Sequence, residues 1–126
     1  MKMTAEQIEQ GLRNFTGTEG YTRYTFGILL TDGVKWLCDE AKSYWLIDAI
    51  GSYQSTPKVK NDESLQGFQF WTLKVNTTEK TAVLILERDS NDVVLTQKIE
   101  YTDFPLTEIK LYYSPQDKVC LLPGEY

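Results

Sequence analysis

The stretch FQFWTLKVNTTEKTAVLILER, Phe68 to Arg88, holds two runs rich in apolar and β-branched residues, with the polar turn NTTEK between them. Such a pair of runs is typical of a β-hairpin. Three more runs of the same kind follow, VVLTQKIEY, IKLYY and KVCLL, and the segments SND, TDFP and SPQD separate them. Because the separating segments are rich in turn-forming residues, the sequence predicts an antiparallel meander over the second half of the chain.

The first half of the chain carries helical patterns. In TAEQIEQGLR, residues 4–13, Thr4 is a candidate N-cap and Gln7 occupies the capping-box position three residues later. These features predict a short amphipathic helix. The segment YTRYTF, residues 21–26, alternates aromatic and polar residues and predicts a strand, which ILLT continues or restarts after Gly27.

Two interpretations are open for the segment that follows. TDG, residues 31–33, could close a two-residue hairpin between ILLT and VKWL, or it could cap a helix. We favour the helix, because apolar side chains recur after it at helical spacing, at Val34, Leu37, Cys38 and Ala41. A second helix is expected directly afterwards, over Tyr44–Tyr53, and the polar segment 55–67 is expected to be a linker.

With helices in its first half and strands in its second, the chain is expected to form one α+β domain over residues 1–126. The N-terminal helices should pack on one face of a mainly antiparallel sheet formed by the C-terminal meander. A chain of 126 residues is long enough to bury a sizeable core, and 41% of its residues are hydrophobic, as in ordinary globular proteins.

The sequence contains no histidine. This excludes Ser-His-Asp and Cys-His catalysis, zinc sites with histidine ligands, haem held by histidine, and the usual general base at neutral pH. Asp89 and Asp92 resemble a calcium-binding loop but lack its spacing and its closing glutamate, so a turn is favoured there. We therefore expect no metal, no cofactor and no enzymatic activity.

Cysteine usage and hydropathy bear on the compartment. Cys38 and Cys120 lie far apart in the sequence and inside apolar stretches, which favours two reduced core residues over a disulfide. The longest apolar runs have three to five residues, far short of the ~20 that a membrane-spanning helix needs. The first residues, MKMTAEQIEQ, lack the hydrophobic core of a signal peptide. The sequence therefore predicts a cytoplasmic protein with no membrane partner.

The chain is acidic, with a formal net charge of −5 from 18 acidic and 13 basic residues. Binding to a phosphate backbone depends on clustered Lys and Arg, so direct binding of DNA or RNA is disfavoured. An acidic surface instead accelerates the encounter with a basic partner. We expect that partner to be a host protein with a basic surface.

The helix expected over Tyr44–Tyr53 places Asp48 away from its apolar arc. Tyr44 and Ser52, one turn on either side, carry hydroxyls that can donate to this carboxylate. The simpler interpretation is a solvated acid flanked by half-buried rings, and the other is a partner-binding face. The candidate partner-binding residues are the off-core side chains of both helices: Trp36, Glu40, Tyr44, Trp45, Asp48 and Ser52.

Several motifs along the chain, NFTGTE, LLTDGVKWL, AKSYWLIDAIGSYQ, FQFW, IEYTDFPL and IKLYY, resemble an uncharacterised bacterial family of unknown function found on phages, plasmids and other mobile elements. The resemblance covers most of the chain and carries over no activity and no catalytic residue. Many small proteins of mobile elements inhibit host machinery by binding it. The resemblance thus implies, by analogy, an anti-CRISPR-like inhibitor of a nucleic-acid-binding defence effector.

Our leading hypothesis is accordingly a non-enzymatic, acidic binding protein that inhibits a host protein. A small enzyme that uses carboxylates is the alternative from another class, with Asp32, Asp48 and Asp103 as its candidate acids. A deep pocket lined by two or more of them would favour the enzyme. A third hypothesis, an immunity protein that neutralises a cognate toxin, differs from the first in its genome neighbourhood.

Overall fold

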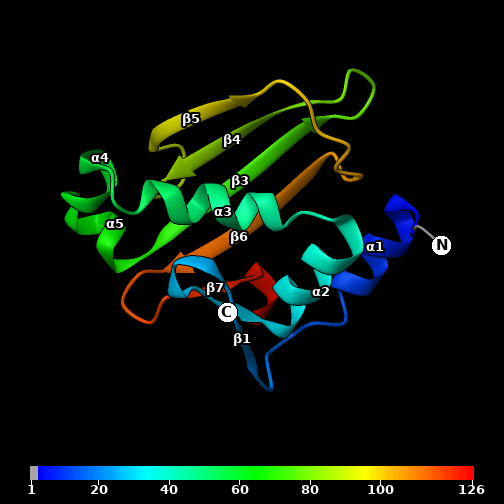
Figure 1. The fold of residues 1–126 in the computed structure, drawn as a ribbon, viewed down its shortest axis with the longest axis horizontal. Helices are drawn as coiled ribbons and strands as arrows, with labels where there is room; N and C mark the ends of the chain where they lie inside the picture. The colour runs from blue at the N-terminus through cyan, green and yellow to red at the C-terminus, as the bar shows by residue number, and fades with distance from the viewer. Residues whose placement is uncertain (1–2) are drawn as a thin grey trace.

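The computed structural model describes residues 3–126 as an α+β structure, which confirms the predicted fold class (Figure 1). The described residues form five α-helices and seven strands. The helices are α1 (Ala5–Leu12), α2 (Asp32–Ala41), α3 (Tyr44–Tyr53), α4 (Pro57–Lys60) and α5 (Glu63–Gly67). The strands are β1 (Tyr21–Arg23), β2 (Leu29–Thr31), β3 (Gln69–Asn76), β4 (Thr81–Glu87), β5 (Val93–Ile99), β6 (Glu108–Ser114) and β7 (Val119–Leu121). Two 3-10 turns, η1 (Thr25–Gly27) and η2 (Pro123–Glu125), are also present.

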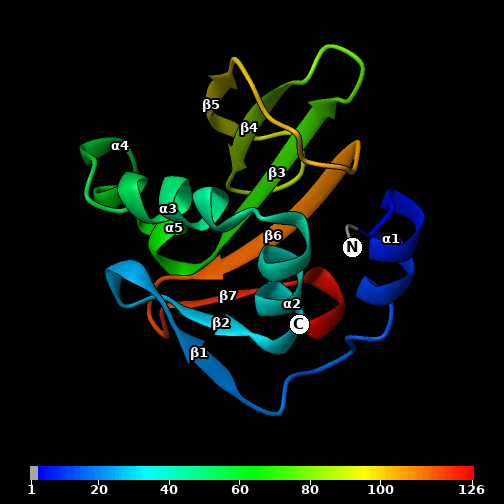
Figure 2. The same ribbon diagram turned by 45° about the vertical axis from the view of Figure 1, so that its right-hand side comes forward.

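All seven strands belong to one sheet, in the order β1-β2-β7-β6-β3-β4-β5 (Figure 2). Neighbouring strands are antiparallel except β2 and β7, which run parallel. The sheet is thus mainly antiparallel, as predicted. The strands β1 and β2 come from the first half of the chain, so the C-terminal strands do not form the sheet alone.

Of the strand pairs in the predicted meander, β3–β4, β4–β5 and β6–β7 are present, and only the pairing of β5 with β6 is wrong. β6 pairs with β3 instead of β5, because the connection 100–107 crosses the end of the β3–β4 hairpin and is held there. The Thr102 amide donates to the Lys80 carbonyl at 2.8 Å, and the side chains of Phe104 and Leu106 are each 2% exposed. Burial of these two large apolar side chains stabilises the crossing connection and leaves β5 at the edge of the sheet.

The segment 55–67, predicted as a linker, contains the short helices α4 and α5. Each is held by one buried apolar side chain, Val59 in α4 and Leu65 in α5. Pro57 opens α4 at a position where a missing amide hydrogen costs little, and Asp62 caps α5 by accepting from the Leu65 amide at 3.1 Å. One apolar anchor per helix produces no helical period, so the sequence pattern misses both helices.

The predicted helix starts are confirmed. Thr4 and Gln7 form a capping box at the start of α1. Thr31 caps α2, so TDG begins a helix and does not close a hairpin. A residue from the other end of the chain reinforces this cap, because the Glu125 carboxylate accepts from the Thr31 hydroxyl at 2.6 Å and from the Gly33 amide at 3.1 Å.

β1 and β2 form a hairpin in which Tyr21 lies opposite Thr31. The strand expected over residues 21–26 therefore ends at Arg23, because residues 24–28 reverse the chain, and ILLT restarts as β2. Within this turn Phe26 has a φ of 64°, a left-handed backbone that bulky residues rarely adopt.

The buried core combines side chains of α2, α3 and the strands of the sheet. The predicted apolar stripes are buried, with exposures of 4% or less at Val34, Leu37, Cys38, Ala41, Leu46, Ile47 and Ile50. Figure 1 shows α3 crossing in front of β3 and β6. At the end of α3 the Tyr53 ring lies 5.8 Å from the Trp71 ring, and its hydroxyl donates to Gln97 of β5 at 2.7 Å. Cys38 and Cys120 are free and buried, which confirms their predicted place in the core.

The longest helices, α2 and α3, have ten residues each. No helix within residues 3–126 has the length and apolar character that crossing a membrane requires.

Candidate binding surface

Asp48 is exposed, in agreement with its predicted position off the apolar arc of α3. The hydrogen-bond partners suggested for it are wrong. The Tyr44 hydroxyl donates to Asp39 at 2.6 Å, and the Ser52 hydroxyl donates to the Ala49 carbonyl at 2.7 Å. Ser52 thus bonds within its own helix, as serine hydroxyls often do, and Tyr44 turns toward a carboxylate at the end of α2.

Tyr24, from the loop after β1, is the hydroxyl that lies beside Asp48. Its ring stacks on Tyr44 with centroids 5.0 Å apart. Burial, followed by the hydrogen bond and the charge of Asp48, raises the pKa of Tyr24. Hydrogen bonds from Lys35 and Tyr44 lower the pKa of Asp39. The polar groups on this side of α3 are therefore engaged with one another.

Trp36 is half-buried and packs against the end of α1. Its ring centroid lies 5.7 Å from that of Phe15, and a Cβ on Gly11 would come within 2.2 Å of the indole. Trp45 is half-buried against the core, and Glu40 is half-buried on α2. The six candidate residues therefore lie against different neighbours. Trp36 packs against α1, whereas Tyr44 and Asp48 lie beside Tyr24. Their role in partner binding stays a prediction.

A hollow of about 450 Å³ lies on the sheet, over β3, β4 and β6. Successive side chains of a strand point to opposite faces, so the side chains of Phe70, Thr72 and Lys74 point to the face opposite the buried Leu73. Trp71, between them in the strand, also borders the hollow. We call this feature the sheet hollow, and its principal lining residues are Phe70, Thr72, Lys74, Glu87, Lys110 and Tyr112.

A row of three side chains crosses the sheet hollow. Phe70 lies opposite Glu87 of β4 on one side and opposite Tyr112 of β6 on the other. Residues so placed have Cβ atoms about 4.5–5.5 Å apart. The Phe70 and Tyr112 rings meet edge to face at 5.1 Å, and the rings of Phe68 and Tyr126 join the same cluster. The Glu87 carboxylate therefore borders a cluster of aromatic rings.

The charged lining of the sheet hollow consists of three carboxylates and two lysines, Glu87, Asp89, Glu108, Lys74 and Lys110. Lys74 and Glu108 lie directly opposite each other, so their charges offset. Glu87 is oriented by the Asn91 amide, which donates to its Oε2 at 2.9 Å. A carboxylate beside aromatic rings attracts a cationic side chain. The Glu87 end of the sheet hollow is thus suited to an Arg or Lys of another molecule.

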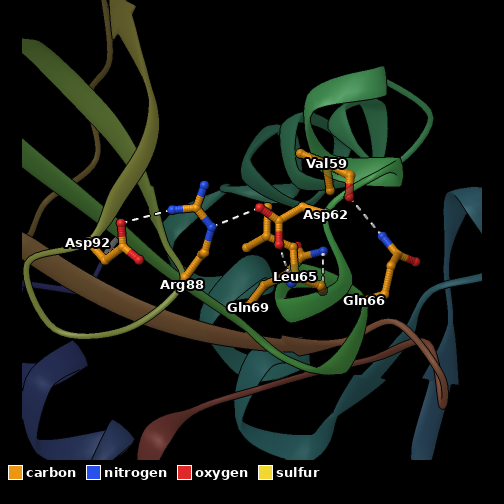
Figure 3. A network of polar contacts seen from close by, with 7 residues as sticks. All are labelled: Val59, Asp62, Leu65, Gln66, Gln69, Arg88 and Asp92. Atoms are coloured by element: carbon orange, nitrogen blue, oxygen red, sulfur yellow. Dashed lines mark hydrogen bonds and ion pairs between the residues drawn. The ribbon is translucent and has the colours of Figure 1, made fainter.

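The rim of the sheet hollow is tied to the helices through Arg88 (Figure 3). Its Nε donates to Asp62 at 2.7 Å, and its Nη1 donates to Asp92 at 2.8 Å. The hydrogen bond from Arg88 lowers the pKa of Asp62. Because Asp62 also caps α5, this network links α5 to the β4–β5 turn, where Asp89 lines the sheet hollow.

Residues 6–126 match the model of DUF6876, a family of unknown function. The chain belongs to this family. The match confirms the resemblance to an uncharacterised family and adds no activity. No curated protein and no solved structure matches the chain. The function of this DUF6876 member must therefore be inferred from its own side chains.

The acids proposed for an enzyme do not line the sheet hollow. Asp32 accepts from the Glu19 amide at 2.9 Å, Asp48 lies beside Tyr24, and Asp103 lies in the connection before β6. Among residues 3–126, no three His, Cys, Asp or Glu side chains gather as a metal site. Burial raises the pKa of Cys38 to about 12, so its thiol stays protonated at neutral pH and is a poor nucleophile.

The sequence pattern did not single out the residues of the sheet hollow. One signal for them exists, because the alternation in FQFWTLK places Phe70, Thr72 and Lys74 on one face of a strand. Tyr112 could not be added to that face, since a meander would place β6 beside β5. Only the observed pairing of β6 with β3 brings Tyr112 beside Phe70.

Proposed function

We propose that this DUF6876 member is a non-enzymatic binding protein that recognises a basic protein surface through the sheet hollow. The observation that carries the proposal is the row formed by Glu87, Phe70 and Tyr112. An Arg or Lys side chain laid over the rings gains cation–π attraction and a charge-assisted hydrogen bond to Glu87. Aromatic side chains at a desolvated centre are typical interface anchors.

We further propose that α1, α2 and α3 all lie on one face of the sheet, which leaves the sheet hollow on the other face open to a partner. Burial along β3 supports this arrangement, because Leu73 is 1% exposed and the adjacent Lys74 is exposed, although Thr72 on the same face as Lys74 is only 6% exposed. A sheet that is packed on one face and solvated on the other has this pattern.

We extend the proposal to inhibition of a host protein, such as a nucleic-acid-binding defence effector. The net charge of −5 supports it, because a basic nucleic-acid groove attracts an acidic protein. The two free cysteines support a cytoplasmic location. An immunity protein that neutralises a basic toxin would use the same surface, and a toxin gene beside this one would favour that version.

The test is capture of a partner from a bacterial lysate at low and moderate salt, followed by affinity measurements on the purified partner with variants. Glu87→Gln should weaken binding about tenfold or more, because it removes a charge-assisted hydrogen bond. Tyr112→Ala should weaken it by about thirtyfold, as for an interface hot spot. Glu79→Gln is the matched control, since it removes the same charge from the exposed β3–β4 turn.

The outcomes separate the proposal from its rivals. Recovery of no partner at either salt concentration would overturn it, and an equal loss with Glu79→Gln would show that only the net charge matters. If Asp48→Asn or Trp45→Ala weakens partner binding and Glu87→Gln does not, the partner binds the surface predicted on α2 and α3 instead of the sheet hollow. Because Asp48 is exposed, Asp48→Asn should change the free energy of unfolding by no more than about 0.5 kcal/mol.

A further inference from the structure

A second pocket, of about 350 Å³, lies where η1, the end of α3, α4 and the β6–β7 turn meet. We call it the lysine pocket, and the lining residues that matter here are Phe26, Gly51, Ser55, Lys60, Tyr113 and Lys118. Its volume falls within the range of about 300–1,000 Å³ that is usual for small-molecule sites.

The charged side chains that line the lysine pocket are Lys60 and Lys118, and no carboxylate of the described residues lines it. The charge of this lining is thus opposite in sign to that of the whole chain, which has 18 acidic and 13 basic residues. The exposed Lys118 side chain lies beside η1, since its Nζ is 3.7 Å from the point where a Cβ on Gly27 would stand. The lining is therefore cationic on two sides.

Tyr113 adds a neutral donor to these two cations. Its side chain is 4% exposed. Burial raises the pKa of Tyr113, so the phenol keeps its proton at neutral pH. A phenol that keeps its proton can donate a hydrogen bond to an anion without adding a negative charge to the pocket.

Phe26 forms an apolar wall of the lysine pocket at a cost in backbone strain. Its φ is 64°, in the left-handed region, and its side chain is 54% exposed. The ring lies over Gly51, where a Cβ would come within 2.4 Å of it. A half-exposed ring on an unfavourable backbone contributes little to the core, and such strain is concentrated at functional sites. The absence of a side chain at Gly51 makes room for this ring.

We propose that the lysine pocket binds a small organic anion, a phosphate or carboxylate group carried on an apolar body. The anionic group lies between the ammonium groups of Lys60 and Lys118 and accepts from the Tyr113 hydroxyl, while the apolar body packs on Phe26. This site is separate from the sheet hollow, where carboxylates outnumber lysines, and it does not depend on the function proposed above.

The test is an NMR titration of the full chain with phenyl phosphate, benzoate and neutral benzyl alcohol. Phenyl phosphate or benzoate should shift the amide signals of residues 26–28, 51–55 and 118, and the stronger of the two identifies the anionic group. Lys60→Gln and Lys118→Gln should each weaken binding about tenfold, as expected for the loss of a charged hydrogen bond. Lys98→Gln, which removes an exposed lysine of β5 that lines neither the lysine pocket nor the sheet hollow, is the control and should bind as the wild type does.

Melting temperatures and amide spectra close to those of the wild type would show that the lysine variants fold. The proposal is overturned if neither anion shifts these signals, or if benzyl alcohol shifts them equally. It is also overturned if both lysine variants bind as tightly as the wild type, or if Lys98→Gln loses as much affinity as they do.

Discussion

Along β3, Trp71 and Leu73 are each 1% exposed, whereas Phe70 is half-buried and Lys74 is exposed on the opposite face. The first face packs against the core, which includes side chains of α2 and α3. The second face carries the sheet hollow. Neighbouring residues of one strand are thus under different constraints, and substitutions should lower stability on the first face and affect binding on the second.

Polarity does not separate the two faces. Gln69 lies on the buried face and is 0% exposed. Its side chain accepts from the Trp71 indole at 2.9 Å and donates to the Leu65 carbonyl at 3.1 Å, and it also bonds to the amide of Gln54. The open face, in turn, carries aromatic rings. What distinguishes the buried face is that its polar side chain is fully hydrogen-bonded.

The largest expected effect is on the buried face. Leu73→Ala should lower the free energy of unfolding by about 2–5 kcal/mol, because truncation leaves a cavity in a packed core. Lys74→Ala, one residue further along, should change it by no more than about 0.5 kcal/mol. Urea unfolding of the two variants measures both values. Equal losses would show that the two faces of β3 are equally buried, and the comparison would fail.

An intermediate effect is expected for the buried polar group. Gln69→Leu should cost about 1–3 kcal/mol, because it leaves the Trp71 indole N–H and the Gln54 amide without their partner. Gln66→Leu is the control, since the Gln66 side chain is half-buried and donates to the Val59 carbonyl at 3.0 Å. Urea unfolding should show the larger loss for Gln69→Leu. A neutral or stabilising Gln69→Leu would mean that the buried face tolerates a purely apolar lining.

The smallest expected effect on stability comes from the ion pair between Arg88 of the β4–β5 turn and Asp62 at the start of α5, and it depends on pH. Because Arg88 lowers the pKa of Asp62, the ion pair stabilises the fold above the unfolded-state value of about 4 and is lost as the pH falls through the lower folded-state value. Asp62→Asn keeps an N-cap oxygen and removes the charge.

Thermal unfolding between neutral and acidic pH tests this point. The stability difference between the wild type and Asp62→Asn should be present at neutral pH and should shrink below about pH 4. A difference that stays constant at all these pH values would show that the ion pair with Arg88 does not stabilise the fold.

The candidate surface was predicted only in part. Asp48 is exposed as its helical position requires, because the period of a single helix determines which residues leave the core. The partners of its neighbours were not predictable, since Tyr44 turns to Asp39 and Tyr24 arrives from a distant loop. The contacts of Tyr44 and Tyr24 both depend on how separate elements pack together. The spacing of residues within one helix carries no information about such packing.

The sequence alone determined the features that short-range physics controls. These include the capping box of Thr4 and Gln7, the bounds of α3 and the positions of the five C-terminal strands, because capping and side-chain periodicity act within a few residues. The tertiary structure alone decided the order of the strands and the cap that Glu125 adds to α2. The physical reason is that the burial of Phe104 and the hydrogen bonds of Glu125 join residues far apart in the chain, and such contacts form only when the whole core packs.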